Sequence, residues 1–124
     1  MLPHKWVDKV WGKEEWIVNT PQYCGKVLHL KHGYRCSLHY HPVKDETFMC
    51  IEGVVKVETV QPNGHTVIQV LEGVRRDALR VLPGTPHRFT ALSAEAKLVE
   101  FSTTHSDEDV VRLEESGRIP MQYK

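Results

Sequence analysis

The sequence lacks a long apolar run, an excess of either charge and any closely spaced pair of cysteines. No apolar segment approaches the about 20 residues of a membrane-spanning helix, and the first residues lack the continuous apolar stretch of a signal peptide. Sixteen Lys and Arg residues balance sixteen Asp and Glu residues, and neither sign forms a block that could follow a polyanion. These absences predict a cytoplasmic protein that binds neither nucleic acid nor a membrane.

The cysteine count and the chain length bound the class of protein further. Cys24, Cys36 and Cys50 are an odd set without a CxxC pair, which indicates reduced thiols rather than a disulfide framework. A chain of 124 residues, 40% of them hydrophobic, is expected to form one domain over residues 1–124 with a core of its own. A bound metal would therefore serve function rather than folding.

Short segments rich in β-forming residues, separated by glycine and proline turn signals, dominate the middle of the chain. Because no βαβ alternation interrupts them, they favour a small all-β antiparallel sandwich or barrel. The predicted strands are Cys24–Lys31, Arg35–His41, Glu46–Ile51, Val54–Val60, Thr66–Leu71, Arg80–Leu82, His87–Ala91 and Ala96–Thr103.

The C-terminal residues have a different pattern. Ser106, followed by the acidic residues 107–109, is typical of a helix N-terminus, and Val110, Val111 and Leu113 supply an apolar stripe. Gly117 provides a stop signal. We therefore expect one short amphipathic helix that packs against the barrel.

Three histidines and one glutamate have spacings that suit a metal site. His39 and His41 lie two apart in a predicted strand, so both imidazoles project from one face. Glu46 follows a short segment with Pro42, which can turn the chain back toward that face, and His87 follows the predicted turn 83–86. Three nitrogens and one oxygen suit a divalent Mn, Fe, Co, Ni or Zn ion, and the ligand set does not choose among them.

These residues also carry a family resemblance. The first signature of the cupin superfamily is matched at every fixed position, and the second is matched at its glycine and histidine but has Leu82 and Ala91 in place of a proline and an asparagine. The matching residues are Gly33, His39, His41, Glu46 and Gly53, then Gly84 and His87. The resemblance implies a double-stranded β-helix barrel over about residues 25–103, metal ligands at His39, His41, Glu46 and His87, and a homodimer.

The flanks of the barrel resemble those of sugar-isomerase cupins. Trp11-Gly12, Glu15 and Trp16 are similar to the entry segment of type II mannose-6-phosphate isomerases, and residues 108–118 are similar to their tail. The longer segment between His41 and Glu46 is closer to the D-lyxose isomerase group. The resemblance implies an aldose–ketose isomerase acting on a small sugar or sugar phosphate through a metal-stabilised enediolate.

Such a reaction needs a base that moves a proton between C1 and C2. Glu100 is the first candidate, because it shares a strand face with Ala96 and Leu98; if Val99 and Phe101 point inward instead, Glu100 faces outward. Weaker candidates for the base are Glu52 and Glu58.

Cationic side chains near the predicted ligands suit a developing negative charge. Lys44, in the loop before Glu46, could neutralise an enediolate or bind a phosphate. Arg88 and Arg112 could recognise a phosphate through bidentate hydrogen bonds. One or two of the tryptophans Trp6, Trp11 and Trp16 could stack on a sugar, although core packing is the commoner role.

Two other functions fit the same ligands. Three histidines and a glutamate can hold Fe(II) for a dioxygenase, which would consume O₂, whereas an isomerase works without it. The third possibility is a sugar-binding cupin without catalysis, because a fold alone does not name a reaction.

Overall fold

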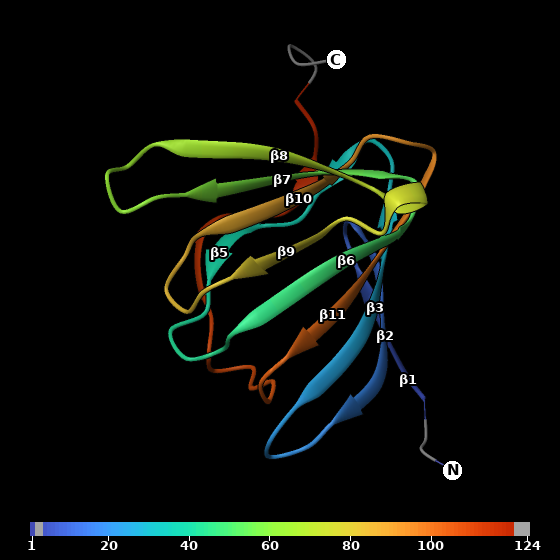
Figure 1. The fold of residues 1–124 in the computed structure, drawn as a ribbon, viewed down its shortest axis with the longest axis vertical. Coiled ribbons are helices and arrows are strands. Elements are labelled where there is room, and N and C mark those ends of the chain that lie inside the picture. Colours follow the sequence, from blue (N-terminus) through green and yellow to red (C-terminus); the bar gives the residue numbers. More distant parts are fainter. Residues whose placement is uncertain (2–3, 121–124) are drawn as a thin grey trace.

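Two antiparallel sheets enclose a common core (Figure 1). The computed structural model describes Met1 and residues 4–120. The first sheet has the spatial order β1, β2, β3, β11, β6 and β9. The bounds of these strands are β1 Lys5–Lys9, β2 Gly12–Asn19, β3 Cys24–Lys31, β11 Glu95–Ser102, β6 Glu46–Glu52 and β9 Ala78–Val81.

The second sheet is centred on β10. β7 pairs along one side of β10 and β8 pairs with β7, while β4 and β5 share the other side and are followed by β13 and β12. The bounds of these strands are β10 His87–Ala91, β7 Val54–Val60, β8 Thr66–Glu72, β4 Tyr34–Arg35, β5 Leu38–Tyr40, β13 Gly117–Arg118 and β12 Val111–Glu114. The predicted antiparallel β-barrel is confirmed; the segment predicted as one strand over Arg35–His41 is two strands, β4 and β5.

Every second side chain of the central strands points into the barrel, and the type of these inward residues changes along the strands. The inward side chains of β3, β6 and β11 are apolar toward one end of the barrel, where Leu28 pairs with Leu98 and Leu98 with Cys50. Toward the other end the inward side chains are Lys26, Glu46 and Glu100, all buried. The same three strands therefore supply a hydrophobic core and, beside it, a cluster of buried charges.

Gly53, the last glycine of the first signature, lies in the turn between β6 and β7. Its φ is +72°, a left-handed backbone conformation that residues with a Cβ rarely adopt. A Cβ at this position would lie 2.0 Å from the carbonyl oxygen of Glu95. The turn therefore needs glycine for both its conformation and its close approach to the neighbouring chain segment.

The predicted C-terminal helix is wrong. Val111–Glu114 form β12, in which Val111 pairs with Tyr40 of β5, and residues 106–109 form a turn closed by the Asp109 N–H and the Ser106 carbonyl at 3.0 Å. The carboxylates of Asp107 and Asp109, expected in the first turn of that helix, bind His105 and the Val43 N–H instead. The edge of β5 pairs with the backbone of this segment. Among the described residues the only helical element is the 3-10 turn Gly73–Arg75. No helix in this part of the chain is long and apolar enough to span a membrane.

The three cysteines are free, as the sequence predicts, and the structure shows that all three are buried. Burial raises the pKa of Cys36 to about 12, so this thiol is protonated and unreactive at neutral pH. The core thus holds together without a covalent cross-link.

Candidate metal centre

Three of the four predicted ligands come together at β5, the residue that follows it, and β10 of the second sheet. His39 lies in β5 and His87 begins β10; the two residues are direct partners across this antiparallel pair. His41 follows β5 by one residue. One ring nitrogen from each of the three histidines lies within 4.8 Å of the others, an arrangement that could hold a metal ion.

Backbone carbonyls orient all three rings. Because a carbonyl oxygen only accepts, each Nδ1 carries the hydrogen, and the Nε2 lone pair is left as the potential ligand. The contacts are His39 Nδ1 to Ser37 O at 2.9 Å, His41 Nδ1 to Asp109 O at 2.6 Å and His87 Nδ1 to Thr85 O at 2.9 Å. The three Nε2 atoms are thus prepared for a shared ion by groups of this chain.

Glu46, the first residue of β6, lies beside this triad. Its Oε1 is 3.6 Å from the His41 Nε2, and its Oε2 is 3.2 Å from the His87 Nε2. Oε2 of Glu46 and Nε2 of His87 are buried, and neither has a hydrogen-bond partner among the described residues. Two buried acceptors facing each other are unfavourable alone, so the residues fit a divalent cation that both would bind.

The protonation state of the histidines also suits a metal. Burial lowers the pKa of His39 to about 3, with the neighbouring His87 adding to the effect. Burial likewise lowers the pKa of His41. Both rings are therefore neutral around pH 7, which is the form that binds metal ions.

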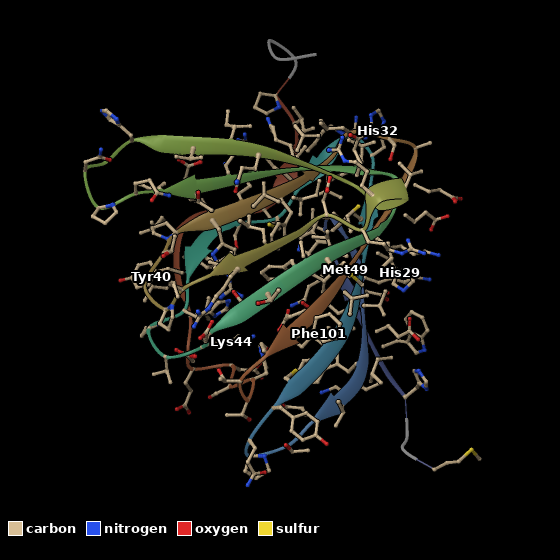
Figure 2. The ribbon with its side chains drawn as sticks, in the orientation of Figure 1. His29, His32, Tyr40, Lys44, Met49 and Phe101 are labelled. Carbon is tan, nitrogen blue, oxygen red and sulfur yellow. The ribbon has the colours of Figure 1, made fainter. Side chains whose placement is uncertain are left out.

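Glu100 and Lys44 form a second cluster of buried charges. Glu100 lies on the inward face of β11 with Ala96 and Leu98, so of the two orientations open from the sequence the inward one is found. The Nζ of Lys44 is 3.3 Å from Glu100 Oε2 and 3.7 Å from Glu46 Oε1. Lys44 lies beside the beginning of β6 (Figure 2). Its ammonium group links Glu100 to Glu46, the carboxylate next to the histidines.

The charges of this second cluster reinforce each other. Burial by itself would raise the pKa of Glu100, but the ammonium groups of Lys44 and Lys26 outweigh it and the pKa is lowered. Burial would lower the pKa of Lys44, but Glu100 and Glu46 outweigh it and the pKa is raised. Glu100 is therefore a carboxylate and Lys44 an ammonium at neutral pH.

Two residues of this cluster were not among the predicted site residues. Lys26, 1% exposed, has its Nζ 3.3 Å from His105 Nδ1 and 3.6 Å from Glu14 Oε1. His105 Nδ1 also lies 2.9 Å from the Nζ of Lys44. Lys26 could have been found as a lysine on the apolar face of an alternating strand, whereas the spacing of His105 gave no signal.

The other residues predicted as a base or as a phosphate ligand are Glu52, Glu58, Arg88 and Arg112. Glu52 pairs with Lys97 and Glu58 with Lys56, and neither lines the cavity. The buried guanidinium of Arg88 donates to the carbonyl of Cys36 and to Glu114, so it joins strands. Arg112 lines the cavity.

The tryptophans have separate environments. Trp11 is part of the core, and Trp6 is 51% exposed. The ring of Trp16 lines the cavity but already has the ammonium groups of Lys26 and Lys5 at 4.0 and 4.5 Å from its centroid. The ring of Trp16 therefore already has two cation–π partners.

A single cavity of about 430 Å³ contains both clusters. Its walls include the three histidines and, from the other sheet, the charged residues Lys26, Glu46 and Glu100. The volume is in the range of sites that bind small molecules. The cavity can therefore hold an organic ligand in contact with the histidine triad and Glu100 together.

Two proteins similar to this chain in sequence are named as sugar isomerases. No protein-family model matches the chain. It is 32% identical over 111 residues to a D-lyxose ketol-isomerase of Cohnella laeviribosi and 35% identical over 112 residues to a D-lyxose/D-mannose isomerase of Thermosediminibacter oceani. These matches include 73% and 74% of the chain, which spans 61% of the length of each relative.

Solved structures share the fold at lower sequence identity. The capsular polysaccharide assembling protein CapF of Staphylococcus aureus superposes with a TM-score of 0.82 at 18% identity, covering 92% of this chain and 32% of CapF. Oxalate decarboxylase of Bacillus subtilis superposes with a TM-score of 0.77 at 22% identity, covering 89% of this chain and 30% of the enzyme. At these identities the likeness concerns the fold alone.

Proposed function

Because this chain has the cupin fold and resembles D-lyxose isomerases in sequence, we propose that it is a metal-dependent aldose–ketose isomerase. The observation that carries the proposal is the joint presence, in one cavity, of a histidine triad with free Nε2 atoms and a buried, ionised carboxylate, Glu100. An isomerisation between C1 and C2 needs both a cation near two oxygens and a base near the carbons. The substrate would be a small sugar or sugar phosphate.

His39, His41, His87 and Glu46 would hold the metal. A divalent cation bound there would supply Lewis-acid stabilisation for the negative charge that develops on the carbonyl and hydroxyl oxygens of the sugar. The carbonyl contacts at each Nδ1 fix the rings before any ion binds, so little reorganisation is needed.

Glu100 would act as the base that takes the proton from one carbon and returns it to the other. Its Oε2 accepts hydrogen bonds from Lys44 at 3.3 Å and from Ser102 Oγ at 2.8 Å. No described residue donates to Oε1, which is left for the substrate. The two bonds on one oxygen thus orient the carboxylate while its second oxygen stays available.

Lys44 would hold Glu100 in place and balance the charge of the site. Its Nζ lies between Glu100, Glu46 and the Nδ1 of His105, so the ammonium has three partners. The Nε2–H of His105 donates to Asp107 at 2.9 Å, which leaves Nδ1 as the acceptor for Lys44. The ammonium therefore also places positive charge beside the oxygens of a bound enediolate.

The test is metal analysis of the purified protein, followed by an anaerobic screen of aldoses, ketoses and their phosphates in deuterated water. An isomerase should interconvert at least one pair and incorporate deuterium at C1 or C2 without O₂. Turnover that requires O₂ would indicate a dioxygenase instead. Sugar binding without conversion or deuterium uptake would indicate a binding protein and overturn the proposal.

A further inference from the structure

Asp109 contacts the metal centre from a distant part of the chain. Its carboxylate oxygens accept from the backbone N–H groups of Val43 and Lys44, both at 2.9 Å. Its backbone carbonyl accepts from Nδ1 of His41 at 2.6 Å. One residue of the C-terminal segment therefore binds both a predicted ligand and the loop that leads from it to Glu46.

The loop needs such a partner for a physical reason. Residues 42–45 lie between β5 and β6 outside either strand, and Pro42 has no N–H to donate. The N–H groups of Val43 and Lys44 are thus the first two donors after His41, and one carboxylate satisfies both. Hydrogen bonds to a charged acceptor are stronger than those between neutral groups, so this contact fixes the loop well.

The same two bonds determine where the Asp109 carbonyl lies. A carboxylate held by consecutive N–H groups leaves its own backbone little freedom, and the carbonyl then meets His41 at hydrogen-bond distance. This carbonyl keeps the hydrogen of His41 on Nδ1 and leaves Nε2 facing the triad. The hydrogen bond that the Lys44 backbone N–H donates to Asp109 anchors the residue whose ammonium contacts Glu100.

We propose that Asp109 is a positioning residue that sets the tautomer and orientation of His41 and anchors the loop bearing Lys44. The inference rests on the proposed metal site. Neighbouring acidic residues of the same segment have different contacts: Asp107 is 95% exposed and binds His105, and exposed Glu108 makes no ion pair or side-chain hydrogen bond with a described residue. The role is therefore specific to position 109.

The experiment compares Asp109→Ala and Asp109→Asn with Glu108→Gln, which removes the same charge one residue away. In the metal-free proteins, nitrogen-15 NMR of the histidine rings reports which nitrogen of His41 carries the hydrogen. Titration with Zn²⁺ alone, in competition with a chelator, gives the metal dissociation constant. Zn²⁺ is chosen because imidazole nitrogens suit it and because it has no redox chemistry of its own.

We expect Asp109→Ala to lose the Nδ1–H preference of His41 and to raise the Zn²⁺ dissociation constant about 10- to 100-fold. Asp109→Asn keeps one side-chain acceptor and should show a smaller change, which covers the case in which the alanine variant folds poorly. Glu108→Gln should match the wild type in both measurements.

Two results separate the inference from the function on which it rests. If the wild type binds Zn²⁺ but both Asp109 variants keep the His41 tautomer and the wild-type affinity, the positioning role is wrong. If the wild type itself binds no Zn²⁺, the proposed metal site fails, whatever the variants do. A change in Glu108→Gln equal to that in Asp109→Asn would show a general charge effect and would also overturn the inference.

Discussion

His39 and His87 lie opposite each other on β5 and β10, and their ring centroids are 4.5 Å apart. The backbone pairing of the second sheet, rather than a loop, sets this distance. Leu28, Leu98 and Phe48 form the core from the other sheet. The barrel therefore holds the imidazoles together with its own packing, and removal of one ring should not unfold it.

We expect His39→Ala to lose bound metal and keep its fold. The substitution removes one of three converging nitrogens and the hydrogen bonding of one Nδ1–H, which Ser37 O and Ser37 Oγ share, so the free energy of unfolding of the metal-free protein should fall by only about 1 kcal/mol. Metal content after dialysis and denaturant unfolding measure the two effects. His65→Ala, which removes an exposed histidine outside the triad, is the matched control. Full metal content in His39→Ala would exclude this residue as a ligand.

Glu100→Gln should retain metal and lose turnover. The substitution keeps the shape of the side chain but removes the group that would take the proton, and loss of a general base typically lowers the rate by about 10²- to 10⁴-fold. Glu95→Gln, an exposed change on the same strand, should leave turnover unchanged. Steady-state kinetics beside metal analysis separate the roles. Undiminished turnover in Glu100→Gln would remove Glu100 as the base.

Local alternation in the sequence was sufficient to predict that the histidines converge. The HxH spacing puts His39 and His41 on one face, whereas alternation left two orientations open for Glu100, and the burial of Ala96 and Leu98 in the structure decides between them. The prediction for His39 and His41 depends only on near neighbours in a strand. The geometry of such strands fixes the direction of each side chain once the buried face is known.

Contacts between distant segments could not be predicted in this way. His105 meets Lys26 across 79 positions of sequence, and nothing in its local pattern indicates a partner. The helix predicted from residue 106 fails for the same reason. The apolar residues Val111 and Leu113 fit a helix stripe locally, but pairing with β5 decides the structure of this segment.

The Glu100–Lys44 pair predicts a pH dependence of stability. The pKa of Glu100 is lowered from 4.5 in the folded protein, because nearby ammonium groups outweigh the effect of burial. A lowered carboxyl pKa stabilises the fold fully above the unfolded pKa, and this contribution is lost as the pH falls through the folded pKa. The relevant window is therefore the acidic range below about pH 4.5.

We expect the difference in unfolding free energy between the wild type and Glu100→Gln to be large near neutral pH and to shrink as the pH falls below about 4.5. Breaking a buried ion pair typically destabilises by about 3–5 kcal/mol. Denaturant unfolding of both metal-free proteins from neutral to acidic pH measures the difference. For Glu95→Gln the difference should stay near zero throughout. A gap for Glu100→Gln that widens as the pH falls would contradict the lowered pKa.

Two glycines of the first signature should respond differently to alanine. Gly33 and Gly53 have φ values of +88° and +72°, so Gly→Ala adds a similar conformational strain of about 1–2 kcal/mol at either position. A Cβ at Gly33 meets nothing within 4 Å, whereas at Gly53 it would lie 2.0 Å from the Glu95 carbonyl oxygen. Overpacking of this kind typically adds about 1–3 kcal/mol.

Gly53→Ala should therefore be less stable than Gly33→Ala by about that additional amount when both are unfolded in denaturant. Because both variants share the left-handed conformation, the difference isolates the close approach between the β6–β7 turn and β11. Equal stability of the two variants would mean that the turn moves away from Glu95 without loss. In that case the glycine at position 53 would be required for its backbone conformation alone.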